Sequence, residues 1–440
     1  MAEPTLVVRG GSVVGPHGVA RLDVAIAGER IVELAPTVDV PVGARLLDAS
    51  GCLVGPGLVD LHTHLRQPGK EEAETVETGA RAAALGGYTA VVAMPNTDPP
   101  IDSVGVARQV LALGRGAPAE VAVAGAITVG RAGTALAPLG ELADVGVTLF
   151  TDDGTGVQDG ALMRRALEYA KSLGVTLAQH CEDASLAGGG CMHEGAWSSR
   201  LGLPGMPAAA EEVMVARDIA LARLTGAPVH FLHLSTAGSV ALVRQAKCEG
   251  LAVTAEAAPH HIVLTDELVS GYDAVFKVNP PLRTESDRAA VVAGLCDGTI
   301  DAVATDHAPH APEAKEAPFD QAPPGMLGLQ SALPIAWSVL APHVGPEGIF
   351  ALMSSQPAAI AKLRAVDPRV ARHSPQGGPL CVGATANLCL FDPDATTTVV
   401  PERLASRSRN TPYAGRTFAG AVRHTVLRGE PVVVDAEAQR

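Results

Sequence analysis

The stretch VDLHTHLRQPG, residues 59–69, places two histidines one residue apart directly after a hydrophobic run. Successive side chains of a β-strand point to opposite faces, so Asp60, His62 and His64 share one face. The preceding residues GCLVGPG, 51–57, favour a strand that begins after a turn. This pattern predicts a strand that presents two imidazoles to one metal ion, although the same pair also occurs on ordinary solvated strands.

Further apolar segments follow along the chain, and they alternate with alanine-rich helical stretches such as TVETGARAAALGG, 75–87. Such alternation is typical of βαβ units with a parallel sheet. We predict eight strands: GLVDLHTH (57–64), YTAVVAMPN (88–96), EVAVAGAIT (120–128), GVTLFTDD (146–153), GVTLAQHCED (174–183), PVHFLHLST (228–236), LAVTAEAAPHH (251–261) and IDAVATDHAPH (300–310). Eight such units predict an α/β fold with a (β/α)₈ TIM barrel, whose active site lies at the carboxyl ends of the strands.

The two terminal segments have a different pattern from the middle of the chain. TLVVRGGSVV (5–14) and RLDVAIAGERIVELAP (21–36) are typical of short strands divided by turns, and the pattern returns in GATANLCLFDPDATTTVV (383–400). We predict that both ends join in one small β-sandwich domain. The predicted division assigns residues 1–56 and 370–440 to the β-sandwich and residues 57–369 to the barrel.

Composition narrows the class of protein. Hydrophobic residues make up 47% of the 440 residues but aromatic residues only 3%, which predicts a core of Ala, Val and Leu. A net charge of -14 without a basic run argues against a nucleic-acid surface. No secretory leader or apolar membrane span is evident, so we expect a soluble cytoplasmic protein. The seven cysteines are odd in number and scattered, which disfavours a disulfide framework.

Six histidine and aspartate side chains at the strand ends are candidate metal ligands: His62, His64, Asp153, His180, His233 and Asp306. Six nitrogen and oxygen donors exceed what one tetrahedral zinc takes, whereas two zinc ions that share a carboxylate use them all. Zinc lowers the pKa of a bound water towards neutrality and polarises a carbonyl. Asp306 is then placed to take the proton of the nucleophile and hand it to a leaving nitrogen.

Several neighbouring residues are competing candidates. Asp152 adjoins Asp153, and we expect only Asp153 to point inward. His230 lies three residues before His233, hence on the opposite strand face, and we expect it to pack against a helix. His260 and His261 are candidates for lining the site or for a structural role. Cys181 is better explained as a small buried hydrophobic residue than as a ligand.

The chain resembles the cyclic amidohydrolases over essentially its whole length, and within them the dihydroorotases of the long single-chain bacterial type. Eight motifs in order carry the resemblance: DLHTHLRQPG (60–69), MPNT (94–97), TDDG (151–154), QHCED (179–183), HLST (233–236), KVNPPLR (277–283), TDHAPH (305–310) and PPGMLGLQ (323–330). It implies the reversible interconversion of N-carbamoyl-L-aspartate and L-dihydroorotate in pyrimidine biosynthesis, with zinc as the cofactor and two ions per subunit.

The resemblance also implies roles for substrate-binding residues. Arg66, Asn96 and His310 are expected to hold the substrate carboxylate, and Asn279 to contact the ring amides. A guanidinium fork matches a carboxylate, which supports the role of Arg66. The segment around Pro324 and Gly325 is expected to approach the substrate through its backbone and close over it. Asn96 and Asn279 have turn formation as an alternative role.

Two departures from related patterns bear on the alternatives. Gln67 stands where relatives usually have Glu, at a flanking position. No lysine lies between Lys70 and Lys171, so Asp153 must bridge the metals in place of the carboxylated lysine of many amidohydrolases. This disfavours an allantoinase, a hydantoinase or a dihydropyrimidinase. A non-catalytic scaffold partner of aspartate transcarbamoylase should have gaps among the ligands, and none is missing. We expect a homodimer, and association with aspartate transcarbamoylase is compatible with an enzyme.

Overall fold

The computed structural model describes residues 3–15, 18–364 and 374–440. Its central feature is a sheet of eight parallel strands in the order β17-β16-β15-β12-β11-β10-β9-β8. The strands are β8 (Leu58–Thr63), β9 (Tyr88–Ala93), β10 (Glu120–Gly125), β11 (Leu149–Phe150), β12 (Thr176–Gln179), β15 (Val229–Phe231), β16 (Val253–Ala257) and β17 (Ala302–Val303). A parallel bridge between Thr63 and His307 joins the two ends of the sheet. The predicted barrel is therefore confirmed.

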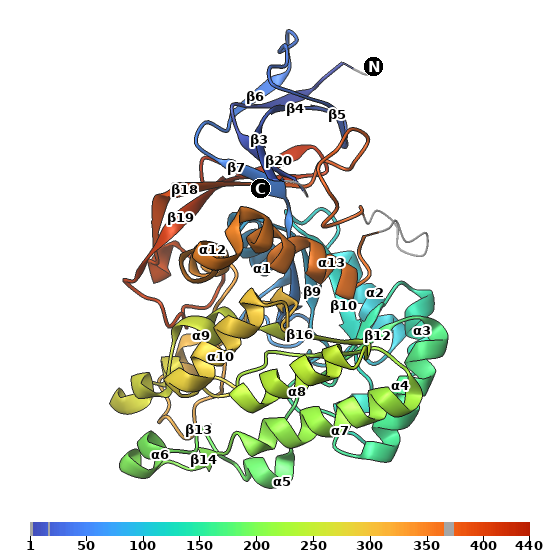
Figure 1. The fold of residues 1–440 in the computed structure, drawn as a ribbon, viewed down its shortest axis with the longest axis vertical. Coiled ribbons are helices and arrows are strands. Elements are labelled where there is room, and N and C mark those ends of the chain that lie inside the picture. Colours follow the sequence, from blue (N-terminus) through green and yellow to red (C-terminus); the bar gives the residue numbers. More distant parts are fainter. Residues whose placement is uncertain (1–2, 16–17, 365–373) are drawn as a thin grey trace.

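Helices follow the strands and cover the barrel (Figure 1). The longer ones are α1 (Val76–Leu85), α2 (Val104–Leu113), α4 (Gly160–Leu173), α7 (Ala209–Thr225), α8 (Ala237–Cys248), α10 (Glu285–Cys296) and α12 (Ala332–Phe350). Thr75, Asp159, Thr236 and Thr284 each begin a helix, because their side-chain oxygens accept a backbone N–H of the first turn.

Shorter elements occupy the connections. They are α3 (Leu139–Asp144), α5 (Ala184–Ala187), α6 (Ala196–Leu201), α9 (Pro259–Val263), α11 (Pro312–Lys315), α13 (Gln356–Ile360), β13 (Met192–His193), β14 (Gly205–Met206), the 3₁₀ turns η1 (Val129–Arg131), η2 (Asp266–Gly271), η3 (Ala274–Phe276) and η5 (Pro401–Arg403), and the π-turn η4 (Ala351–Ser355).

Small apolar side chains fill the barrel, as the composition predicts. Leu61, Val92, Ala124, Ala178 and Ala302, from five of the strands, belong to one buried cluster that also contains Ile360 of α13. Small side chains let strands and helices approach closely at native packing density. None of the described helices is both long and apolar enough to cross a membrane.

Strands from both ends of the chain form two further sheets, which lie together at one end of the molecule (Figure 1). The first has the order β5 (Arg30–Ala35), β4 (Asp23–Ala27), β1 (Leu6–Arg9), β6 (Arg45–Asp48). The second has the order β21 (Glu437–Ala438), β20 (Glu430–Val434), β19 (Thr417–Leu427), β18 (Leu388–Thr398), β7 (Leu53–Pro56), β2 (Ser12–Gly15), β3 (Gly18–Arg21). One buried cluster contains Ile26 of the first sheet and Leu390 of the second, which makes the unit a β-sandwich built from both termini.

The second sheet also connects the sandwich to the barrel. β7 ends at Pro56, and β8 begins at Leu58, so the first predicted domain boundary falls between two strands of different sheets. The other predicted boundary, between residues 369 and 370, lies outside the described residues. The division into domains therefore stays a prediction.

Candidate metal centre

The six predicted ligands meet at the carboxyl ends of the barrel strands. His62 lies on β8, and each of the others lies within three residues after a strand: His64 after β8, Asp153 after β11, His180 after β12, His233 after β15 and Asp306 after β17. All six are at most 5% exposed. Burying this many ionisable groups together is costly unless they pair with one another or bind a metal.

Asp153 stands at the centre of this cluster. Its Oδ1 lies 3.4 Å from His62 Nε2, 3.4 Å from His180 Nδ1 and 3.5 Å from His233 Nε2. Its Oδ2 lies 3.5 Å from His64 Nε2. The ligand atoms form two groups of three, His62 with His64 and Asp153, and Asp153 with His180 and His233. The carboxylate of Asp153 is thus common to both groups.

These spacings fit a metal better than they fit direct hydrogen bonds. Ligands about 2.0–2.1 Å from a tetrahedral ion stand about 3.3–3.4 Å apart along each edge, close to the separations around Asp153. His62 Nε2 is buried and has no hydrogen-bond partner among the described residues, although it faces Asp153 Oδ1. The donor set and this unpartnered nitrogen therefore fit a divalent metal.

Asp306 reaches the first group from the carboxyl end of β17. Its Oδ1 lies 3.2 Å from His64 Nε2 and 3.6 Å from His62 Nε2, and its Oδ2 lies 4.0 Å from His260 Nε2. Burial opposes ionisation, but the hydrogen bond with His64 and the charge of His62 hold the pKa of Asp306 below its ordinary value. Asp306 is therefore an ionised carboxylate, able to accept a proton.

Comparisons with known proteins identify the family. A family model described as dihydro-orotase-like matches residues 51–239. A dihydroorotase of Pelotomaculum thermopropionicum is 48% identical over 434 residues, which cover 98% of this chain and 99% of that protein. The chain belongs to the dihydroorotase family. A dihydroorotase of Mycobacterium tuberculosis is 47% identical over 439 residues, 98% of this chain and 99% of that protein. The resemblance found in the motifs is confirmed.

Solved structures of other amidohydrolases share the fold of this dihydroorotase family member. An L-hydantoinase (dihydropyrimidinase) from Arthrobacter aurescens superposes with a TM-score of 0.87 at 23% identity, covering 100% of this chain and 98% of that one. A D-hydantoinase (dihydropyrimidinase) from Thermus sp. superposes with a TM-score of 0.82 at 23% identity, covering 98% of this chain and 96% of that one. At this identity the likeness concerns the fold alone, because one fold hosts many functions.

A buried glutamate that sequence analysis missed orients His62 in this dihydroorotase site. Glu256 Oε1 accepts from His62 Nδ1 at 2.9 Å, and its Oε2 accepts from His230 Nε2 at 3.1 Å. Burial alone would raise the pKa of Glu256, but the hydrogen bonds from His230 and His62 lower it to about 2. A proton held on Nδ1 leaves Nε2 of His62 free to bind a metal.

His230, which we expected to pack against a helix rather than bind a metal, has its hydrogen-bond partners on a strand. Its Nδ1 lies 2.9 Å from Thr254 Oγ1, so the ring is hydrogen-bonded to two residues of β16, Thr254 and Glu256. The face argument fails because β15 ends at Phe231, and His233 has a left-handed φ of 31°. Strict alternation therefore stops before His233.

Asp152, Cys181 and Lys171 have partners away from the ligand groups. Asp152 Oδ1 accepts the N–H groups of Ile127 at 2.8 Å and Thr128 at 3.0 Å, so it holds a loop. Cys181 is buried, with its Sγ 3.7 Å from the Gln179 carbonyl. Lys171 donates to the Thr225 carbonyl at 2.9 Å and lies on α4, so it does not substitute for a bridging lysine.

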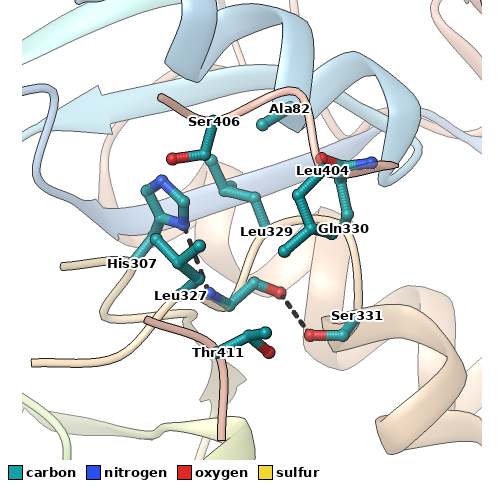
Figure 2. A pocket seen from close by; sticks show the side chains of 10 residues that line it. Ala82, His307, Leu327, Leu329, Gln330, Ser331, Leu404, Ser406 and Thr411 are labelled. Atoms are coloured by element: carbon teal, nitrogen blue, oxygen red, sulfur yellow. Dashed lines mark hydrogen bonds between the residues drawn. The ribbon is translucent and has the colours of Figure 1, made fainter. Parts of the chain in front are cut away.

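His307, next to Asp306, turns away from the metal ligands. Its Nε2 donates to Glu74 Oε2 at 3.2 Å, and its Nδ1 accepts the N–H of Gly328 at 3.2 Å. Figure 2 shows this second contact beside a cavity of about 10 Å³, also lined by Ser331 and Ser406. That volume holds at most one water molecule. The cavity is therefore a packing feature behind the site.

Four predicted substrate-binding residues lie together. Arg66 donates from Nε to the Pro309 carbonyl at 3.0 Å, and its Nη2 is 3.4 Å from His310 Nε2. His310 Nε2 lies 2.8 Å from the Pro324 carbonyl. A Cβ added to Gly325, whose φ is 145°, would stand 2.7 Å from His310 Nε2. Only glycine allows this close approach.

The two asparagines of the predicted substrate site reach the predicted metal ligands, Asn96 directly and Asn279 through Glu182. Asn96 Oδ1 accepts from His64 Nδ1 at 2.8 Å, which leaves Nε2 of that histidine free for a metal. Asn279 Nδ2 donates to Glu182 Oε2 at 2.7 Å. Burial and the neighbouring Arg66 lower the pKa of His310 to about 3, so its imidazole is neutral at physiological pH. Of Arg66 and His310, Arg66 is therefore the residue that offers a positive charge to an anionic substrate.

Proposed function

We propose that the chain catalyses the reversible interconversion of N-carbamoyl-L-aspartate and L-dihydroorotate. The observation that carries this proposal is the pair of ligand groups sharing Asp153, in a chain 47–48% identical to dihydroorotases over nearly its full length. The reaction closes or hydrolyses a cyclic amide, which requires an activated water, a polarised carbonyl and a group that moves a proton.

The metal in this proposal is zinc, with two ions per subunit. His62, His64, Asp153 and Asp306 would hold one ion, and Asp153, His180 and His233 the other. Bound zinc lowers the pKa of a water ligand and polarises the carbonyl to be attacked. The chain supplies four imidazoles and two carboxylates, and Glu256, Asn96 and Glu182 orient the imidazoles of His62, His64 and His180.

Asp306 moves the proton. In the direction of hydrolysis, its carboxylate takes a proton from the attacking water and delivers it to the ring nitrogen as the carbon–nitrogen bond breaks. In the direction of closure, it takes a proton from the carbamoyl nitrogen and returns it to the departing oxygen. The same oxygen atoms serve both directions, as reversibility requires.

The substrate carboxylate is assigned to Arg66, with Asn96 and His310 beside it. The buried guanidinium favours a ligand that carries a carboxylate. Hydantoin and dihydrouracil lack that group, which makes hydantoinase or dihydropyrimidinase the weaker alternative. A scaffold without activity is also weaker, since all six ligands are present. The homodimer, the association with aspartate transcarbamoylase and the cytoplasmic location stay predictions.

Metal removal tests this function directly. Chelated protein is expected to lose ring opening of L-dihydroorotate, and returned zinc to restore it, with little rate on hydantoin, dihydrouracil or allantoin. The measurement is the initial rate on each ring before chelation, after chelation and after zinc is added. Activity confined to another ring would assign the chain to a different amidohydrolase reaction, and activity unaffected by chelation would refute the metal centre.

The loop before Gly325 should affect substrate binding through Lys315. Its ammonium donates to the carbonyls of Ala274 at 3.1 Å, Lys277 at 3.1 Å and Pro323 at 2.8 Å. Replacing Lys315 with Met removes these three hydrogen bonds, at a cost of about 1–3 kcal/mol, although the carbonyls of Ala274 and Lys277 keep a backbone donor. We expect the KM for dihydroorotate to rise roughly tenfold with a smaller change in kcat. An unchanged KM would mean that the loop holds its position without Lys315.

A further inference from the structure

Glu182 joins the candidate metal centre to the candidate substrate site. Its Oε2 accepts from Asn279 Nδ2 at 2.7 Å and lies 3.5 Å from His180 Nε2. The side chain is 23% exposed, so it lies at the edge of the buried cluster. One carboxylate oxygen thus faces a metal-binding residue and a substrate-binding residue at once.

The contact with Asn279 determines which amide atom the substrate meets. An ionised carboxylate only accepts hydrogen bonds, so Asn279 must turn its NH₂ group towards Glu182. Its Oδ1 is then directed elsewhere, and it is buried without a hydrogen-bond partner among the described residues. A buried acceptor without a partner is unfavourable. Asn279 is therefore ready to accept a hydrogen bond from an N–H group.

The contact with His180 determines how that imidazole binds a metal. His180 Nδ1 faces Asp153 Oδ1 at 3.4 Å, whereas Nε2 faces Glu182. A proton held on Nε2 leaves the lone pair of Nδ1 for a metal ion. Glu182 thus contacts the ring nitrogen of His180 that faces away from the metal, as Glu256 does for His62. Of these two glutamates, Glu182 is the one that also accepts a hydrogen bond from Asn279.

We propose that Glu182 is a positioning residue that acts in two directions. It holds His180 for metal binding, and it turns Asn279 so that Oδ1 accepts a ring N–H of the cyclic substrate. This inference rests on the proposed function for its substrate half. Its metal half concerns His180 alone and is measured without substrate.

A double-mutant cycle tests the substrate half at saturating zinc. Glu182→Ala and Asn279→Ala are each expected to raise the KM for dihydroorotate by about five- to tenfold. Because Glu182 acts through Asn279, the double variant should have a KM no higher than Asn279→Ala alone. A control cycle combines Glu256→Gln with Asn279→Ala. Their separate effects on the KM should multiply in the double variant, because Glu256 contacts His62 and not Asn279. The proposal would be overturned if the effects of Glu182→Ala and Asn279→Ala on the KM multiplied in the double variant. An unchanged KM in Glu182→Ala would overturn it as well.

Zinc affinity, measured by competition with a chromophoric chelator, tests the metal half. Glu182→Ala is expected to weaken zinc binding about 10- to 100-fold, whereas Asn279→Ala should retain the affinity of the unchanged chain. Glu182→Gln keeps the size of the side chain and should also weaken zinc binding, which separates orientation from a folding defect. Equal zinc affinity in Glu182→Ala, Glu182→Gln and the unchanged chain would overturn the metal half. An unchanged chain without dihydroorotate activity would instead refute the proposed function.

Discussion

Replacing Asp306 with Asn is expected to lower kcat for dihydroorotate by about 10³-fold while zinc stays largely bound. The amide keeps an oxygen near His62 and His64, where Asp306 Oδ1 now lies, so a ligand atom remains. The amide has no basic site for the proton of the attacking water, so proton transfer fails in both directions. The measurements are kcat in each direction and the zinc content of the purified variant.

The control for this variant is Asp297→Asn on the surface. Asp297 pairs with Arg244 at 2.7 Å, and both side chains are exposed, so the change removes a carboxylate far from the ligand groups. Its kcat should equal that of the unchanged chain. If Asp306→Asn retained full activity with zinc bound, another group would have to carry the proton.

The sequence predicts the barrel and the ligand cluster because both depend on local patterns. An apolar strand that ends in His, Asp or Cys is visible along the chain, and the barrel topology brings such ends together. The choice between Asp152 and Asp153 is not local. Asp152 accepts hydrogen bonds from the backbone N–H groups of Ile127 and Thr128, which follow a neighbouring strand. These donors come close to Asp152 only when the sheet is assembled.

The residues that sequence analysis missed orient other residues. Glu256 is the one charged residue of strand β16, a signal that predicts a buried carboxylate with partners. Its partners, His62 and His230, are distant in sequence, so the pairing needs the fold. Glu182 stands in the quoted motif QHCED, but its contact with Asn279 spans 97 positions. Pairings at such range follow from the barrel and not from local spacing.

Replacing Arg66 with Met is expected to raise the KM for dihydroorotate about a hundredfold or more. Arg66 is 8% exposed, and burial lowers its pKa only to about 10, so the guanidinium is charged and largely shielded from water at neutral pH. Loss of one partner of a buried charge pair costs about 2–5 kcal/mol, and each 1.4 kcal/mol is about tenfold in affinity. The measurement is the KM and kcat for L-dihydroorotate and for N-carbamoyl-L-aspartate at saturating zinc.

Two controls separate carboxylate recognition from general damage around Arg66. Arg66→Lys keeps the charge but loses the planar fork, so its KM should fall between those of the unchanged chain and Arg66→Met. Dihydrouracil has no carboxylate, and any slow rate on it should be nearly the same in Arg66→Met and the unchanged chain. The preference for dihydroorotate over dihydrouracil should thus collapse in the variant. An unchanged KM for dihydroorotate in Arg66→Met would assign the carboxylate to a different residue.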